Sequence, residues 1–115
     1  MEKPLILAAL AALAQETRLD TMRLLVREPA GLLAGQISDA LDVRPNTMSA
    51  NLTVLAHAGL VTSTREGRAI RYRANLDGLR AVIAYLLEDC CGGRPDQCAP
   101  LLSGILQQPQ THMEP

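Results

Sequence analysis

The sequence predicts a mainly α-helical domain that contains one β-hairpin. Its 115 residues suit a single domain, and 48% of them are hydrophobic although Phe and Trp are absent. The core must therefore be built from aliphatic side chains, which suit closely packed helices. Apolar residues recur at helical spacing in several stretches, and one further stretch alternates with period two.

Proline and glycine residues mark where these helices begin and end. Glu28 precedes Pro29, and because a residue before proline avoids the α-helical region, the second helix ends there. The fourth helix begins beside Pro45 and ends at Gly59, the asymmetry that helices favour. The helices are expected at residues 5–14, 17–27, 35–41, 46–58 and 76–91.

Residues 60–75 are expected to form the hairpin. Thr62 and Thr64 alternate with their neighbours, the alternation resumes at Ile70, and Gly67 supplies the turn. Only a short break separates the third and fourth helices, so this pair forms a helix-turn-helix. A helix-turn-helix followed by a basic hairpin is a winged helix-turn-helix, whose second helix can enter the major groove of DNA.

The net charge of −1 hides an uneven distribution. Residues 43–75 carry five Arg and one Glu, a net +4, whereas residues 1–42 carry −2 and residues 76–115 carry −3. A basic segment in an acidic chain indicates contact with the DNA backbone, although a solvated charged loop has the same composition. Short polar side chains on the fourth helix can approach base edges while arginines contact phosphates. The expected DNA contacts are Asn46, Thr47, Ser49, Asn51, Arg65, Arg68, Arg71 and Arg73.

Three stretches of the chain resemble the ArsR-type (arsenic repressor-like) metalloregulators. They are ALAQETRLDTMRLL at residues 12–25, TMSANLTVLAHAGLV at 47–61 and STREGRAIRYRAN at 63–75. The resemblance implies a homodimeric winged-helix repressor that binds a double-stranded DNA operator, with the first and last helices in the dimer interface. Residues 1–91 would then form the DNA-binding and dimerisation domain. Residues 92–115 would form a C-terminal segment that ends in a disordered tail.

All three cysteines lie in the stretch EDCCGGRPDQC, residues 88–98. The metal sites of many relatives are absent, because the third helix has no Cys-x-Cys pair and the last helix has no His. The chain also resembles a subgroup with a vicinal Cys pair after the last helix and a third Cys downstream. This resemblance implies that Cys90, Cys91 and Cys98 bind arsenite or antimonite as the inducer, with no organic cofactor. Trivalent arsenic and antimony are soft ions, which prefer sulfur ligands.

Other uses of the three thiols stay open. Cys98 could form a disulfide with Cys90 or Cys91, which would make the protein a thiol-based redox-sensing regulator or a small thiol-transfer protein. The two adjacent cysteines lie too close to pair well with each other. His112 could complete a structural zinc site, or the thiols could be buried without a ligand. A ligand-independent DNA-bending or scaffold protein would share the same fold.

Several other classes of protein do not fit the sequence. We do not expect an enzyme, because His57 has no Ser or Cys partner at a suggestive spacing. The longest apolar run, residues 5–14, has about half the twenty residues that a membrane span needs, so no membrane association is expected. An odd number of locally clustered cysteines favours reduced thiols. The expected location is the cytoplasm.

Overall fold

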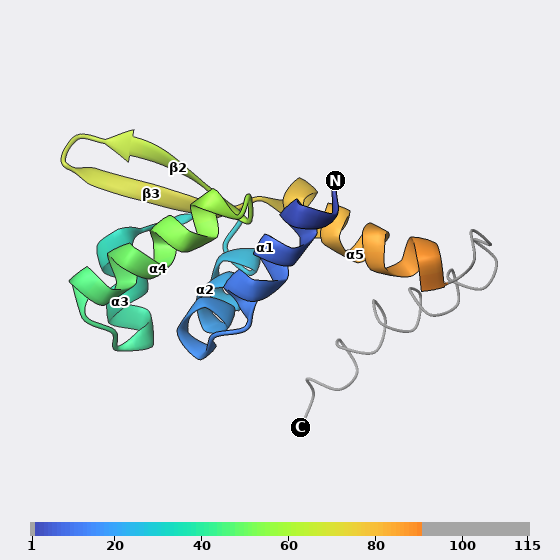
Figure 1. Ribbon diagram of the computed structural model, residues 1–115. Coiled ribbons are helices and arrows are strands. Elements are labelled where there is room, and N and C mark those ends of the chain that lie inside the picture. Colours follow the sequence, from blue (N-terminus) through green and yellow to red (C-terminus); the bar gives the residue numbers. More distant parts are fainter. Residues whose placement is uncertain (1, 91–115) are drawn as a thin grey trace, which may run out of the picture. The chain divides into compact units, whose positions relative to one another are not determined.

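The computed structural model of the chain describes residues 2–90, and the chain divides into two compact units, Met1–Val82 and Ile83–Pro115. Five helices and a small sheet make up the described residues, which confirms the predicted fold class (Figure 1). The predicted domain boundary at residues 91–92 lies at the edge of the described residues and stays a prediction. The elements are α1 (Lys3–Leu13), α2 (Glu16–Val26), β1 (Leu32–Leu33), α3 (Ala34–Leu41), α4 (Pro45–His57), β2 (Val61–Glu66), β3 (Ala69–Ala74) and α5 (Leu76–Cys90).

Local hydrogen bonds define where α2 and α3 begin. The Gln15 side chain accepts a hydrogen bond of 2.9 Å from the backbone N–H of Arg18 in the first turn of α2. The Gln36 side chain accepts one of 2.8 Å from the N–H of Leu33, which ties β1 to the first turn of α3. Both contacts satisfy backbone groups at the helix ends, where the helix itself offers no partner.

The core of the first unit is aliphatic, as the composition predicts. Met48, Leu52 and Leu55 of α4 are each 0% exposed, and their spacing of four and three residues places them on one inner face of the helix. Ile37 of α3 is also fully buried. Ala40 of the same helix is apolar but exposed.

Ser38 is buried on α3 although its side chain is polar. It follows Ile37 directly in the sequence, and its carbonyl accepts a hydrogen bond of 3.0 Å from the Val43 N–H in the turn after α3. The apolar stripe of this short helix is therefore shifted towards Ile37 and Ser38, away from Ala40.

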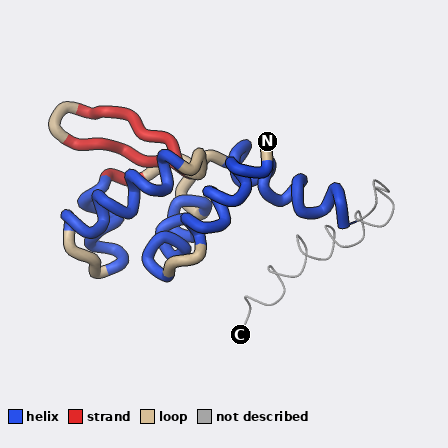
Figure 2. The backbone as a smooth tube through the Cα atoms, viewed as in Figure 1, coloured by secondary structure: helices blue, strands red, loops and turns tan. Residues whose placement is uncertain are grey.

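The sheet has the strand order β1–β3–β2, and both pairings are antiparallel. Strands β2 and β3 form the predicted hairpin, the wing (residues 61–74), with Gly67 in its turn at a φ of 64° (Figure 2). Strand β1 was not expected. Its two residues, Leu32 and Leu33, pair with Tyr72 and Arg71 of β3. The middle of β3 is therefore paired with a strand on each side, whereas β2 is exposed at every residue after Val61.

The wing leads into α5 through a tight junction. The Asn75 side chain donates a hydrogen bond of 2.8 Å to the Gly59 carbonyl, and its backbone N–H donates one of 2.9 Å to the Leu60 carbonyl. Gly78 of α5 lies against the same Gly59 carbonyl, and a Cβ at this position would collide with it. The start of α5 is thus held beside the end of α4 by contacts that leave no room for a side chain.

Large apolar side chains are exposed on four helices of the described residues, with three each on α1 and α5, two on α2 (Leu19 and Val26) and one on α4 (Val54). On α1 these are Leu5, Leu7 and Leu10, and on α5 they include Ile83 and Leu86. None of the helices within residues 2–90 combines the length and the hydrophobicity that a membrane-spanning segment needs.

The chain contains two tyrosines as its only Phe, Tyr or Trp residues. Tyr72 is buried in β3, in the first compact unit. Tyr85 is half-buried on α5, in the second unit. Each compact unit therefore holds one aromatic side chain of this kind.

Candidate nucleic-acid interface

The turn between α3 and α4 contains only Asp42, Val43 and Arg44. Asp42 ends α3 in the left-handed conformation, with φ 55° and ψ 50°, which Asp adopts more readily than most residues. Pro45 then begins α4, where its fixed φ suits the first helical turn and its missing N–H leaves no unpaired donor. This turn brings the N-terminal end of α4 to the surface as the second helix of a helix-turn-helix.

The outer face of α4 near its N-terminus is polar but uncharged. Asn46, Thr47 and Ser49 are exposed, as predicted, and Ala50 is exposed beside them. All four side chains are short, so they allow the helix backbone to approach base edges closely. Arg44, exposed immediately before the helix, adds a positive charge beside them.

Asn51 does not lie on this outer face, and the prediction of an exposed side chain is wrong. Its side chain is 7% exposed, and its Oδ1 accepts a hydrogen bond of 3.0 Å from Nη1 of Arg18 on α2. The residue follows Met48 by three positions and precedes Leu55 by four, so the helical repeat places it on the buried stripe. A buried amide with a protein partner cannot reach a base edge in this conformation.

Arg18 is the residue that sequence reasoning missed. Besides its bond to Asn51, its Nε donates a hydrogen bond of 2.7 Å to the carbonyl of Ala12 in the last turn of α1. The spacing of Asn51 within the apolar stripe of α4 signals a buried amide. Nothing local identifies its partner, because Arg18 lies 33 residues away in the sequence.

The four predicted wing arginines do not share one face of the hairpin. In the strand register Thr64 pairs with Arg71, Thr62 with Arg73, and Arg65 with Ile70. Since side chains alternate along a strand, Arg71 and Arg73 lie on one face and Arg65 lies on the other. Arg68 occupies the turn beside Gly67. The basic charge therefore surrounds the wing instead of forming a single stripe.

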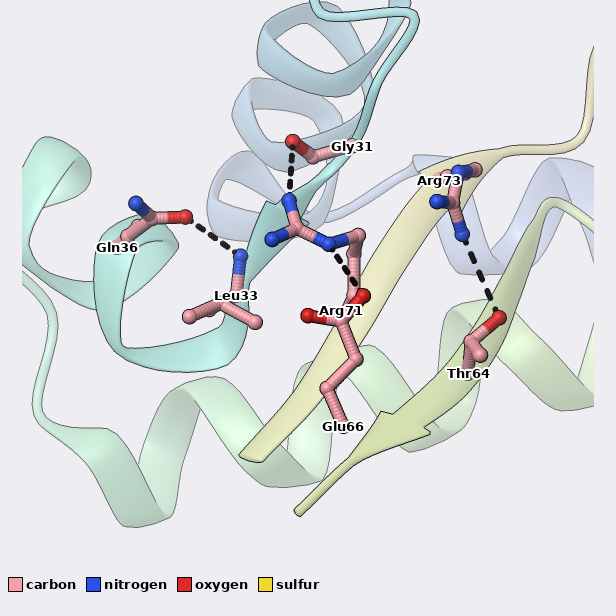
Figure 3. Close-up of polar contacts among 7 residues, drawn as sticks. All are labelled: Gly31, Leu33, Gln36, Thr64, Glu66, Arg71 and Arg73. Atoms are coloured by element: carbon pink, nitrogen blue, oxygen red, sulfur yellow. Dashed lines mark hydrogen bonds and ion pairs between the residues drawn. The ribbon is translucent and has the colours of Figure 1, made fainter. Parts of the chain in front are cut away.

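Arg71 is held by two protein partners (Figure 3). Its Nε donates a hydrogen bond of 2.7 Å to Oε2 of Glu66, and its Nη1 donates one of 3.2 Å to the carbonyl of Gly31. The hydrogen bond from Arg71 lowers the pKa of the Glu66 carboxyl, and the charges of Arg71 and Arg73 act in the same direction. The hydrogen bond to Glu66 likewise raises the pKa of the Arg71 guanidinium. Arg71 thus joins the wing to the loop that precedes β1.

The other wing arginines are less constrained. Nη1 of Arg73 lies 3.4 Å from Oγ1 of Thr64, a long hydrogen bond across the two strands (Figure 3). Arg65 and Arg68 are exposed, and within residues 2–90 neither side chain forms a hydrogen bond or an ion pair. These two guanidinium groups are free to bind an external anion.

The predicted thiol site falls mostly outside the described residues. Cys90 is the last residue of α5, and Cys91 and Cys98 lie beyond it. Within the described part of the chain, no group of three or more His, Cys, Asp or Glu side chains could hold a metal ion. The assignment of the three thiols as ligands therefore stays a prediction.

Known proteins resemble this chain in the region just described. A family model described as a helix-turn-helix domain matches residues 13–64. A Halobacterium salinarum protein named as an arsenical resistance operon repressor, ArsR, is 35% identical over 65% of this chain, and the match spans only 58% of that protein. A biofilm growth-associated repressor of Agrobacterium fabrum is 30% identical, and the match covers 79% of this chain and 90% of the relative.

A solved structure extends these matches to the fold. The solution NMR structure of a homodimeric winged helix-turn-helix DNA-binding domain from Mycobacterium bovis, described as a possible ArsR-family transcriptional regulator, is 30% identical to this chain. It superimposes with a TM-score of 0.62, and the match covers 75% of this chain and 80% of that domain. These relatives are DNA-binding regulators and not enzymes, in agreement with the prediction from the sequence. The chain belongs to the ArsR family of winged helix-turn-helix transcriptional regulators.

Proposed function

We propose that this protein is a transcriptional repressor that binds an inverted-repeat DNA operator as a homodimer and releases it when trivalent arsenic or antimony binds. The DNA-binding part of this proposal is supported by two exposed surfaces of the first compact unit, the outer face of α4 and the wing. The outer face of α4 carries short, uncharged side chains, and the wing presents Arg65 and Arg68, which have no protein partner within residues 2–90. The first surface suits base edges, and the second suits phosphates.

The two surfaces divide the contacts with DNA. Asn46, Thr47 and Ser49 are the proposed base contacts, and Arg65 and Arg68 are the proposed phosphate contacts. Arg71 and Arg73 add positive charge, but their hydrogen bonds to Glu66, Gly31 and Thr64 favour a role in shaping the wing. Such a regulator would act in the cytoplasm, where the DNA of a cell without a nucleus lies.

The proposed dimer would cover the exposed apolar side chains of α1 and α5, the two helices that expose the most of them. Leu5, Leu7 and Leu10 of α1 and Ile83 and Leu86 of α5 would be covered by a second copy. The Mycobacterium bovis relative is homodimeric, which supports the same assembly for this chain. A two-fold dimer carries two copies of α4, so the operator should be an inverted repeat. Light scattering of the purified chain at micromolar concentration should give the mass of a dimer.

The proposed inducer site consists of Cys90, Cys91 and Cys98. Three thiolates suit the soft trivalent ions of arsenic and antimony, and the name of the Halobacterium salinarum relative refers to arsenical resistance. Cys90 ends α5, the helix that also carries Ile83 and Leu86. A ligand bound at the end of this helix would change the proposed dimer interface, and with it the spacing of the two copies of α4.

A DNA-binding titration with arsenite tests this proposal. Arsenite should lower the affinity for the preferred duplex by about 5- to 150-fold, the usual range of coupling between two sites. A variant with Ser at Cys90, Cys91 and Cys98 should bind the duplex normally and should no longer respond to arsenite. Release by a thiol oxidant and not by arsenite would instead favour the redox-sensing alternative. A triple Ser variant that still releases DNA with arsenite would show that the inducer site lies elsewhere.

A further inference from the structure

One guanidinium group joins three helices of the first unit. Arg18 extends from α2, donates from Nε to the Ala12 carbonyl of α1 over 2.7 Å, and donates from Nη1 to Oδ1 of Asn51 on α4 over 3.0 Å. We propose that this Arg18–Asn51 link sets the orientation of α4 and thereby determines DNA sequence specificity without touching DNA. The inference rests on the proposed function, because it assigns to α4 the reading of DNA sequence.

Because Asn51 lies within α4, its bond to Arg18 also fixes the orientation of the outer face of this helix. Asn51 lies on the buried stripe between Met48 and Leu55, while Ser49 and Ala50, its close neighbours in the sequence, are exposed on the opposite side. Successive residues of a helix are about 100° apart around its axis, so any rotation that moves Asn51 also moves Ser49. Holding the amide in place therefore fixes the angle at which the outer face meets a DNA groove.

The other contacts of α4 restrict its rotation about the helix axis less than the Arg18–Asn51 bond does. Met48, Leu52 and Leu55 are fully buried, but apolar contacts are non-directional. Among the described residues, the other side-chain hydrogen bond between the two helices joins Oγ1 of Thr21 to Sδ of Met48 over 3.8 Å. Thioether sulfur is a weak acceptor. The Arg18–Asn51 bond, with an ionised donor and a distance of 3.0 Å, is the directional contact.

Arg18 also connects α4 to the helix proposed for the dimer interface. The Ala12 carbonyl lies in the last turn of α1, where carbonyl groups have no partner within the helix. A positive charge at this end also interacts favourably with the helix dipole. The planar guanidinium can bond to Ala12 and Asn51 together, whereas a lysine ammonium is a compact group on a flexible chain and does not reproduce this fork. The guanidinium therefore holds α4 in a defined orientation relative to the end of α1.

Four variants of the full chain separate this role from the alternatives. Asn51→Leu keeps a side chain branched at the same atom and removes the acceptor, whereas Asn51→Asp keeps an acceptor oxygen. Arg18→Lys keeps the positive charge but removes the planar guanidinium that bonds to two partners. The fourth variant combines Arg18→Lys with Asn51→Leu. Arg23→Lys is the matched control, because Arg23 is an exposed arginine on the same helix. The probes are a duplex that the unmodified protein enriches from a random pool and a scrambled duplex of the same composition.

The measured quantity is the ratio of affinities for the enriched and the scrambled duplex, with thermal unfolding recorded for each variant. Asn51→Leu and Arg18→Lys should each lower the ratio by about tenfold, the effect of misplacing one good base contact. The double variant should lose no more than either single variant, because both changes break the same bond. Asn51→Asp should keep the ratio within about twofold and enrich the same sequence, and Arg23→Lys should change nothing. The added carboxylate weakens binding to both duplexes, and the ratio cancels that effect.

Three results would overturn the inference. Additive losses in the double variant would mean that the two residues act separately. A different enriched sequence for Asn51→Asp would mean that Asn51 contacts a base directly. Lower thermal stability with an unchanged ratio would leave the link a purely structural contact. An unmodified protein that enriches no sequence at all would instead refute the proposed function, which distinguishes the two failures.

Discussion

Helix α4 and the wing differ in how each one exposes its polar side chains. The outer face of α4 has no charge at Asn46, Thr47, Ser49 or Ala50, and its inner face is fully buried. The wing carries four arginines and one glutamate, and residues 62–68 are all exposed. One element is rigidly packed and weakly polar, and the other is exposed and strongly charged.

This difference separates specificity from affinity in physical terms. Base edges are distinguished by hydrogen bonds of defined geometry, which need a reading element held firmly by the core. Phosphates are bound mainly through charge, which tolerates a more exposed element. Five substitutions should each act on one element or the other, and their expected effects decrease from the core of α4 to the Glu66–Arg71 pair of the wing.

Leu52→Ala should have the largest effect, because it removes a fully buried side chain from the inner face of α4. Burial of this kind is worth about 2–5 kcal/mol of unfolding free energy when Leu is cut to Ala. Urea denaturation should show this loss, whereas Thr62→Ala on the exposed wing should stay within about 0.5 kcal/mol. Equal losses at the two positions would contradict the contrast between a packed helix and an exposed wing.

Ser49→Ala should change which DNA sequence is bound. Loss of one good base contact costs about 1–3 kcal/mol for the preferred base, while binding to a scrambled duplex should remain the same. Selection from a random pool, compared with Thr53→Ala farther along the same exposed face, measures the effect. An unchanged sequence preference in the Ser49 variant would remove this residue from the proposed base contacts.

Arg65→Ala and Arg68→Ala should weaken binding to all DNA sequences equally. Each lost phosphate contact should reduce the slope of log affinity against log salt by about one per protomer. The same substitution at Arg27, an exposed arginine at the end of α2, serves as the control for charge alone. A loss confined to the preferred duplex would place these arginines at base edges instead of at phosphates.

Glu66→Gln should have the smallest effect, since the Glu66–Arg71 pair is exposed. The pKa of Glu66 is lowered in the folded protein, so its contribution to stability is present above the unfolded pKa and is lost as the pH falls through the folded value. The stability of the protein should therefore approach that of the variant as the pH drops below about 4.3, the ordinary value for Glu. Thermal unfolding of both proteins across this range checks the sign. A difference that grows in acid would contradict it.

The helices and the hairpin could be predicted because most of them show a clear periodicity of apolar residues, and Pro29, Pro45, Gly59 and Gly67 mark several of their ends or turns. Every helix boundary within the described residues lies within two positions of its expected place. Strand β1 could not be predicted, since Leu32 and Leu33 are too few residues to show an alternation. Their strand conformation comes from pairing with β3, about 40 residues later in the sequence.

The candidate interface was predictable on the exposed side of α4 and less so elsewhere. Asn51 was predicted on the exposed face of α4 because its side chain is polar, although its spacing from Met48 and Leu55 puts it on the buried stripe. Its burial depends on Arg18, a partner that no local pattern identifies. In the same way, the composition predicted DNA contact for all four wing arginines. Only the strand register shows that Arg71, which pairs with Glu66, lies on the opposite face from Arg65.

Because the chain has so few aromatic residues, its intrinsic fluorescence can be assigned to individual tyrosines. Without Trp or Phe, the near-ultraviolet signal of its aromatic side chains comes from two tyrosines. Tyr72 is buried in β3 of the first compact unit, and Tyr85 belongs to the second. A Tyr85→Leu variant would emit from the DNA-binding unit alone, and a Tyr72→Leu variant from α5 alone. Tyrosine fluorescence of this pair can follow the two units separately during one titration without any attached dye.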